Sequence, residues 1–456
     1  MVASLLVAVA DKVGIVMSLF SQTNEFALST IASSTDKREV IAADNIVDAE
    51  SGVMLWAKGK HVNSQLQEKL LKRKLTQPIE ISLQVKDGIN GEKISETAGQ
   101  LISQHEPLSI LGGRNVSSIL AALARTELAA PVQLLMTSAA DRNDGSFEHA
   151  VAVCLTCTAL AIRGGWPESS VETVAVAGLI HDIGEMYINP EYLQAKRELT
   201  PQEWLHVVAH PKVGAMLLQE MTPYPPQVAE MVLSHHERMD GTGYPRQLAG
   251  KHFTREAQLL SIAETITGIL TRRDNALCRA AFALKIILRE YDPNLVGLIT
   301  TLADPAACRL PDGFNLAQAM EHLHGQAEQL KSALQTALEL SRAKLSPDAK
   351  MLAGRCFNLI SKLYASLAAT GALEYCHYKE DLESDEAEVL LSLDVIPAEI
   401  RWRMRSLARD IELGTRKFSE QDRDPFTSLE GILTQYSTKT GEMVSEAKKT
   451  LMPIPG

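Results

Sequence analysis

The sequence predicts a mainly α protein with a small N-terminal α+β module, a central helical bundle and a helical C-terminal extension. Aromatic residues make up only 5% of the 456 residues, while alanine and leucine, which favour helix, are abundant. From about residue 98 onward nearly every segment has helical rather than strand periodicity. A chain of this length has room for roughly two to four domains with a sizeable core.

Residues 1–35 are expected to form a loose N-terminal segment. Asp11 and Lys12 interrupt the apolar residues 1–20, so neither apolar run reaches the roughly 20 residues of a spanning helix. The positive charge that opens a signal peptide is missing before the apolar run. We expect a cytoplasmic protein with no membrane span, for which Met17 is an alternative start.

Residues 36–95 are expected to form the small α+β module. Short apolar runs flank the turn-prone residues 50–52 and predict a hairpin. Asn63 and Ser64 begin a predicted helix that continues to about residue 73. Residues 79–85 alternate like a strand, and a polar, glycine-containing stretch near 86–97 is expected to separate the module from the central domain.

Residues 96–325 are predicted to form an all-α domain, and residues 326–456 a helical extension. Thr200 followed by Pro201 is a good helix start, with an N-cap and an N1 proline. A break at residues 346–347 predicts an antiparallel pair of helices in the extension. The clearest helical segments of the central domain are 115–128, 147–163, 171–184, 201–221 and 255–271.

Charge and cysteine content exclude some classes of protein. The net charge of −11 argues against general binding of nucleic acids or anionic membranes, although a local cationic pocket could hold a phosphate. The six cysteines do not resemble a disulfide framework. Cys154 and Cys157 are interpreted as two buried thiols on one apolar helix, which fits a reducing cytosol. The acidic run 380–388 is interpreted as a solvated face.

Histidines and carboxylates recur along the predicted helices at the spacing of a helix and its return, roughly 25–32 residues. Antiparallel helices with this spacing would bring them to one level of a bundle. Imidazoles with a few carboxylates suit iron, manganese, zinc or nickel. The carboxylate of Asp182 could bridge two such ions, which together promote phosphoryl transfer. The set consists of His149, His181, Asp182, His210, His235, His236 and Glu264.

Two motifs make the sequence recognisable. HDIGE at 181–185 and HHERMDGTGYP at 235–245 resemble the HD-GYP branch of the HD superfamily of metal-dependent phosphohydrolases. The resemblance covers about 140–300. It implies an HD-type helical bundle and a phosphodiesterase that hydrolyses cyclic di-GMP to pGpG or GMP. It also implies two divalent metal ions, iron or manganese, and attack by a metal-bridging hydroxide.

The resemblance also implies a role for each matching residue. Asp182 and His181 would be catalytic, and Asp182 would bridge the two ions. The other ligands of the first ion would be His149, His181 and Glu264, and those of the second ion His210, His235 and His236. The residues that would bind substrate are Gly243, Tyr244 and Pro245 of the motif, together with Arg273 and the residue at position 185.

Three positions depart from the family pattern. Glu185 stands where the family has lysine, Glu264 where it has aspartate, and Ala276 where a basic residue is common. A carboxylate at position 185 would repel a phosphate by about 1 kcal/mol or more at short range, unless Glu185 supplies an extra metal ligand. An alternative function is therefore a weakened cyclic di-GMP-binding regulatory protein that retains its metals. Another is hydrolysis of a different cyclic dinucleotide or nucleotide phosphate. The N- or C-terminal regions could form a homodimer or bind a signalling partner.

Overall fold

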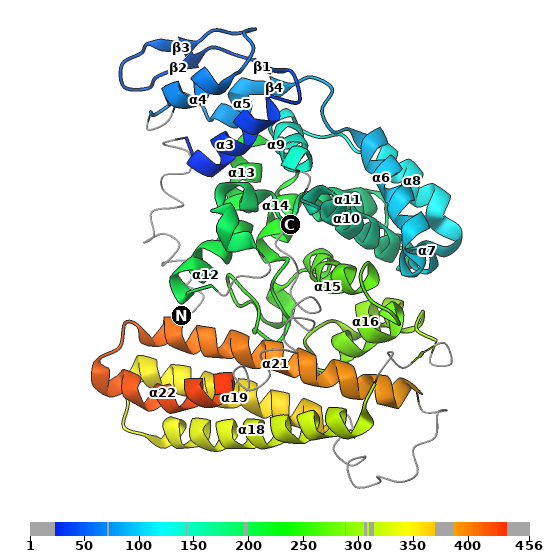
Figure 1. The fold of residues 1–456 in the computed structure, drawn as a ribbon, viewed down its shortest axis with the longest axis vertical. Helices are drawn as coiled ribbons and strands as arrows, with labels where there is room; N and C mark the ends of the chain where they lie inside the picture. Colours follow the sequence, from blue (N-terminus) through cyan, green and yellow to red (C-terminus); the bar gives the residue numbers. More distant parts are fainter. Residues whose placement is uncertain are drawn as a thin grey trace. The chain divides into compact units, whose positions relative to one another are not determined.

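Helices dominate the structure, as the sequence predicts (Figure 1). The computed structural model describes residues 23–70, 73–142, 144–194, 199–287, 289–304, 308–309, 314–369 and 387–435. The alternative start at Met17 and most of the acidic run 380–388 lie outside these ranges. The described residues divide into two compact units, one up to residue 268 and one from residue 269 onward.

The N-terminal part of the first unit is the α+β module. Its strands β1 (Val40–Ala42) and β4 (Leu83–Val85) pair antiparallel. The hairpin predicted around residues 50–52 is confirmed, because β2 (Ile46–Val47) and β3 (Met54–Trp56) pair antiparallel on either side of it. The other elements of the module are α4 (Ser64–Leu70) and α5 (Ile79–Ser82). The expected loose segment 1–35 is wrong over α3 (Glu25–Ser34), a helix that the Asn24 side chain caps and that buries Leu28 and Ile31.

Two expectations for this module are wrong in part. Of the predicted strand 79–85 only β4 is a strand, because its first half is the helical turn α5, in which the Ser82 hydroxyl donates to the carbonyl oxygen of Pro78. The predicted separator near 86–97 is helical from residue 91. There α6 (Gly91–Gln104) begins after Asn90, whose side chain accepts from the N–H of Lys93. A polar composition did not prevent this helix, because the Asn90 side chain accepts a first-turn N–H that has no partner within the helix.

The rest of the first unit is helical. The segment 201–221, predicted as a single helix, consists of two helices that are separated at Val208 and Ala209. The predicted start at Thr200 is confirmed, with a capping box between Thr200 and Glu203. The α-helices are α7 (Glu106–Gly112), α8 (Val116–Ala124), α9 (Ala130–Arg142), α10 (Ser146–Arg163), α11 (Glu168–Ile180), α12 (Pro201–Val207), α13 (His210–Met221), α14 (Pro226–Ser234) and α15 (Arg255–Leu270). The 3-10 helices are η1 (Gly113–Asn115), η2 (Ile183–Tyr187), η3 (Pro190–Leu193) and η4 (Gly250–His252).

Helix α10 packs against α11 (Figure 1) and also contacts α6, α7, α8 and α9. Cys154 and Cys157 are buried free thiols on it, as expected. Among the described helices, α10 is the one whose length and composition would allow it to cross a membrane, and 72% of it is buried inside the protein. Its apolar composition matches its position in the core.

The second unit contains α16 (Ala276–Lys285), α17 (Pro293–Thr300), α18 (Leu316–Arg342), α19 (Pro347–Ala369), α21 (Ala387–Thr415) and α22 (Glu420–Thr434). The break predicted at residues 346–347 is confirmed, because α18 and α19 pack side by side on either side of it (Figure 1). Cys278 and Cys308 form a disulfide. The sequence had not indicated this bond, since the two cysteines belong to no recognisable spacing pattern.

A buried hydrogen bond joins the α+β module to η2. The Tyr187 hydroxyl donates to Glu80 Oε1 at 2.7 Å, and Glu80 is only 4% exposed. The Asn24 side chain also donates to the carbonyl oxygen of Tyr187. The module therefore fixes the turn that comes after His181 and Asp182.

Replacing Glu80 with glutamine is expected to raise the melting temperature at neutral pH. Burial raises the pKa of Glu80 above its ordinary 4.5, and the Tyr187 hydrogen bond only partly offsets this. The stability contributed by such a carboxyl is complete below its unfolded pKa and is lost as pH rises through its folded pKa. Glutamine accepts the same hydrogen bond without ionising. Thermal melts should show the advantage of the variant growing from pH 4 to pH 8, and a pH-independent difference would contradict this reasoning.

Candidate metal centre

The predicted histidines and carboxylates come from separate elements of the first unit and meet at one place. His149 lies in α10 and Glu264 in α15, while His210 is the first residue of α13. His235 and His236 directly follow α14. His181 and Asp182 stand just after the last residue of α11 rather than within a continuous helix. Each side chain is thus presented near a helix end or from a facing helix.

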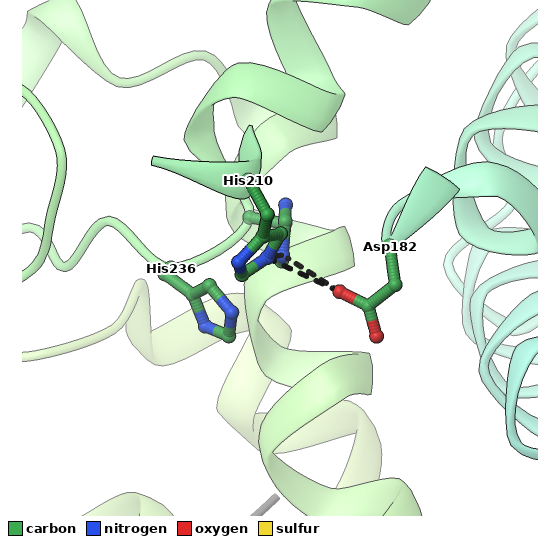
Figure 2. Close-up of side chains that lie close together, drawn as sticks. Asp182, His210 and His236 are labelled. Carbon is green, nitrogen blue, oxygen red and sulfur yellow. Dashed lines mark hydrogen bonds and ion pairs between the residues drawn. The ribbon is translucent and has the colours of Figure 1, made fainter. Parts of the chain in front are cut away.

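Asp182 lies between two groups of nitrogen and oxygen ligands. Its Oδ2 is 2.7 Å from His181 Nε2 and 3.8 Å from His149 Nε2. Its Oδ1 is 3.2 Å from His210 Nε2 and 3.4 Å from His235 Nε2. Figure 2 shows Asp182 and His210 facing each other across this gap, with His236 beside His210.

Two sets of ligand atoms among the described residues are compact enough to hold a cation. In each set all ligand atoms lie within 4.8 Å of one another. The first cluster contains His149, His181 and Glu264, and the second cluster contains Asp182, His210, His235 and His236. Because the two oxygens of Asp182 face different clusters, this carboxylate is placed to serve both.

The hydrogen bonds of the histidines fit a bound cation. Nδ1 of His181, His210 and His235 each lies 2.6–2.9 Å from a backbone carbonyl oxygen in the preceding turn. A carbonyl only accepts, so Nδ1 carries the proton and Nε2 presents a lone pair to the centre. His210 Nε2 and His235 Nε2 are 3.1 Å apart. Lone pairs that converge in this way repel each other unless a cation lies between them.

Three ligand atoms face one another in the protein interior without a well-formed hydrogen bond. His149 Nε2, His181 Nε2 and Glu264 Oε2 are buried, and both nitrogens lie 3.2–3.3 Å from Glu264 Oε2. Buried polar atoms are rarely left unsatisfied in folded proteins. The residues present therefore fit the metal ions that this kind of site implies.

The protonation states of His236 and Asp182 favour metal binding, whereas the pKa of His181, which burial alone would lower, is raised well above its ordinary value by the carboxylates of Asp182 and Glu264. Burial lowers the pKa of His236 well below its ordinary value, and the neighbouring His235 and His210 lower it further. Burial alone would raise the pKa of Asp182, but the adjacent histidines hold it well below its ordinary value. Neutral imidazole and ionised carboxylate are the forms that bind metals.

A close approach of two backbones explains the glycine of the HDIGE motif. A Cβ on Gly184 would overlap the carbonyl oxygen of His210 and crowd the N–H of Gly214. Gly184 therefore lets η2 pack directly on α13. This packing sets the separation between Asp182 and His210.

The GTGYP loop is held by a residue whose role the sequence had not shown. Glu237 is fully buried, and its carboxylate accepts the N–H groups of Arg246, Gln247 and Leu248 at 2.5–3.0 Å. A signal was present, since Glu237 is part of the HHE motif, but an acid beside two histidines is more readily interpreted as a metal ligand. Neither metal cluster contains Glu237.

Tyr244 is placed beside the second cluster by this loop. Its ring stacks on His236 with centroids 4.6 Å apart, and Trp204 lies on another side at 6.0 Å. Gly243 has no room for a Cβ against Glu237 and the carbonyl of His236, and the bond between Tyr244 and Pro245 is cis. The three motif residues therefore form a close-packed wall of the centre.

Other expected site residues are placed differently. Glu185 is 6% exposed and lies near the first cluster without belonging to either set of ligand atoms. Arg273 and Ala276 belong to the second unit. There burial and the charge of Arg279 lower the pKa of Arg273, and Ala276 is buried at the start of α16.

Removing the metal ions is expected to destabilise the protein. An ion present at about 100 times its Kd stabilises the folded state by about 2.7 kcal/mol, which corresponds to a melting temperature shift of roughly 5–10 °C for a domain of this size. A strong chelator should lower the melting temperature of metal-loaded protein, and re-added Mn²⁺ should restore it. An unchanged melting temperature after complete removal would argue against metal binding at the buried clusters.

Comparisons with known proteins match this region of the chain. Residues 133–295 match the HD domain family. A segment of 128 residues is 35% identical to the cyclic di-GMP phosphodiesterase PA4108 of Pseudomonas aeruginosa, covering 28% of this chain and 31% of that protein. A segment of 159 residues is 30% identical to the 3'3'-cGAMP-specific phosphodiesterase 2 of Vibrio cholerae, covering 33% of this chain and 30% of that protein.

A third relative matches a shorter segment. Over 110 residues the chain is 33% identical to the cyclic di-GMP phosphodiesterase response regulator RpfG of Xanthomonas campestris, covering 24% of this chain and 29% of that protein. The chain thus spans about a third of the length of the relatives it matches. The matched region contains both motifs and both clusters. Residues 133–295 therefore form an HD domain that carries the two motifs of the HD-GYP branch.

Proposed function

We propose that the first unit hydrolyses the phosphodiester bonds of cyclic di-GMP, yielding pGpG, GMP or both. The observation that carries this proposal is the position of Asp182, whose two carboxylate oxygens face two separate clusters of buried histidines. A bridging carboxylate of this kind is typical of two-metal sites for phosphoryl transfer. The names of the relatives support the class of reaction.

Two divalent ions would be held by the two clusters. His149, His181, Glu264 and Oδ2 of Asp182 would bind one, and Asp182 Oδ1 with the histidines of the second cluster would bind the other. The mixture of imidazole and carboxylate ligands suits iron or manganese. When bound, such ions supply a hydroxide nucleophile at neutral pH and offset the charge of the phosphate.

The side chains of the chain itself would orient the substrate. Tyr244 offers an aromatic face and a hydroxyl beside the second cluster, and the absence of a side chain at Gly243 keeps the loop backbone close-packed. We assign Arg273 to phosphate binding on its correspondence with the family arginine alone. The hydrogen bonds from Nδ1 keep the His181 and His210 rings oriented.

The test is turnover by metal-loaded protein. Protein purified without oxygen and loaded with Fe²⁺ or Mn²⁺ should convert cyclic di-GMP to pGpG or GMP, resolved by chromatography. Metal analysis of the same sample should give about two ions per chain. A fully loaded protein that turns over no cyclic di-GMP with either metal would exclude the proposal.

Glu185 and Ala276 favour a second candidate, a metal-containing cyclic di-GMP-binding protein with weak hydrolysis. Glu185→Lys separates the two functions. A sharp rise in activity would identify the natural protein as a weakened enzyme or sensor, whereas no change would make the departures incidental. Parallel assays with 3'3'-cGAMP test the other substrate class that a relative's name suggests.

A further inference from the structure

A pocket of the first unit opens next to Asp182. Its empty volume is about 430 Å³, counting its open mouth. The end of α9, the start of α10, the end of α11 and η2 surround it. Its apolar lining consists of Leu135, Met136, Ala139, Ala150, Leu179, Ile183 and Met186.

The pocket adjoins the first cluster, whereas Tyr244 lies beside the second cluster. Its residues belong to the elements that carry His149 and His181, the first cluster. Tyr244 instead stacks on His236 of the second cluster. A substrate whose phosphate lies at Asp182 would therefore extend toward this pocket on one side and toward the GTGYP loop on the other.

Three polar side chains line the pocket besides Asp182. Glu185 is only 6% exposed, and no described residue hydrogen-bonds its carboxyl group. Ser146 Oγ is buried and likewise has no hydrogen-bond partner in the described structure. Arg142 lines the same pocket, and its Nε lies 3.1 Å from Asp144 Oδ2. A buried hydroxyl without a hydrogen bond, beside a buried carboxyl group, calls for a ligand with complementary groups.

The walls that carry these groups are anchored from the α+β module. Arg38 Nε donates to both oxygens of Asp141, the residue before Arg142, at 2.9 Å, and the Ser34 hydroxyl also donates to Asp141. On the other wall Tyr187 of η2 donates to the buried Glu80. The backbone segments that carry Arg142 and Glu185 are therefore fixed before any ligand arrives, which reduces the entropy cost of binding.

We propose that this pocket is a base subsite that selects guanine, with Glu185 and Arg142 as the specificity-determining residues. The inference rests on the proposed function, because it assumes a guanine nucleotide bound at Asp182. The Glu185 carboxyl group would accept hydrogen bonds from N1–H and the exocyclic N2–H of guanine. Arg142 would donate to O6 and N7, the acceptors that arginine commonly recognises in guanine. The apolar side chains would cover the faces of the ring.

The same groups fit adenine and phosphate less well. Adenine presents a lone pair at N1, where guanine has a donor, so it would face the Glu185 carboxylate unfavourably. A phosphate buried here would meet Arg142 and Ser146 but would also face two carboxylates, Asp182 and Glu185. The apolar lining offers a phosphate no further donors. Glu185, which stands where the family has lysine, would thus recognise the guanine base.

The experiment compares GMP and AMP, which differ only in the base. Dissociation constants are measured by calorimetry with full-length, metal-loaded protein. The natural protein is expected to bind GMP at least tenfold more tightly than AMP. Glu185→Gln and Arg142→Gln should each reduce this ratio at least fivefold, mainly by weakening GMP. The matched control is Glu148→Gln, a glutamate exposed on α10, which should leave the ratio unchanged.

Turnover of cyclic di-GMP and cyclic di-AMP by the same variants separates the two proposals. If the GMP preference responds as expected while cyclic di-GMP is not hydrolysed, the proposed function fails and the base subsite stands. If hydrolysis occurs but both variants keep the GMP preference, the subsite is wrong. Equal weakening of GMP and AMP by Arg142→Gln would also overturn it, by indicating a phosphate contact. Melting temperatures and metal content verify that each variant is folded and loaded.

Discussion

Replacing Asp182 with alanine is expected to eliminate binding of the two-ion pair and to lower turnover of cyclic di-GMP by about 10³-fold or more. Asp182 is the residue whose oxygens face both clusters, at 2.7 Å from His181 and 3.2 Å from His210. Without it the second cluster has only imidazoles and the first has one carboxylate, Glu264. A loss of 10³-fold corresponds to about 4 kcal/mol of transition-state stabilisation. Metal analysis and steady-state turnover check both parts.

Two comparisons make this result specific to the bridging position. His236→Ala removes a ligand of the second cluster alone, so it should retain about one ion per chain. Asp44→Ala removes an exposed aspartate of the α+β module and should retain both ions and full turnover. If Asp182→Ala kept two ions with ordinary affinity, the two clusters would not share this carboxylate and the two-metal mechanism would be wrong.

The arrangement of the ligands could be predicted from sequence because it depends on helix lengths. His181, His210 and His235 recur at the spacing of a helix and its return, and the structure places them at successive helix ends. In a regular helix the number of residues fixes the length, and so the distance between the histidines at successive helix ends. The orientation of each ring was not available in that way, because it depends on a hydrogen bond from Nδ1 to a particular carbonyl.

Features that depend on irregular backbone or on distant segments could not be predicted. The turn α5 replaced half of an expected strand, since an alternating pattern of seven residues also fits a short helix followed by a strand. Arg142 and Glu185 are far apart in sequence and belong to no joint motif, yet they line one pocket. The pairing of Cys278 with Cys308 likewise depends on a tertiary approach that spacing does not encode.

Glu237→Ala is expected to lower the free energy of unfolding by about 3 kcal/mol or more. Glu237 is fully buried, and its removal leaves the N–H groups of Arg246, Gln247 and Leu248 without their acceptor. Each buried donor that loses its partner costs about 1–3 kcal/mol. The melting temperature should fall by roughly 6–12 °C, measured by calorimetry on metal-loaded protein.

The same substitution should affect substrate binding more than metal binding. His235 precedes Glu237 and keeps its own hydrogen bond to the carbonyl oxygen of Val232 in α14, so metal content should change little. Tyr244 depends on the loop that Glu237 holds, so KM for cyclic di-GMP should rise. Glu237→Gln keeps one acceptor oxygen, so its KM should lie between those of the natural protein and Glu237→Ala.

Glu230→Ala is the control. Glu230 pairs with Arg246 of the same loop but is 38% exposed, and an ion pair at such a position contributes about 1 kcal/mol or less. Equal effects of Glu230→Ala and Glu237→Ala on melting temperature and KM would mean that the surface ion pair holds the loop. A large effect of Glu237→Ala alone would show that this one buried carboxylate holds the loop that carries Tyr244.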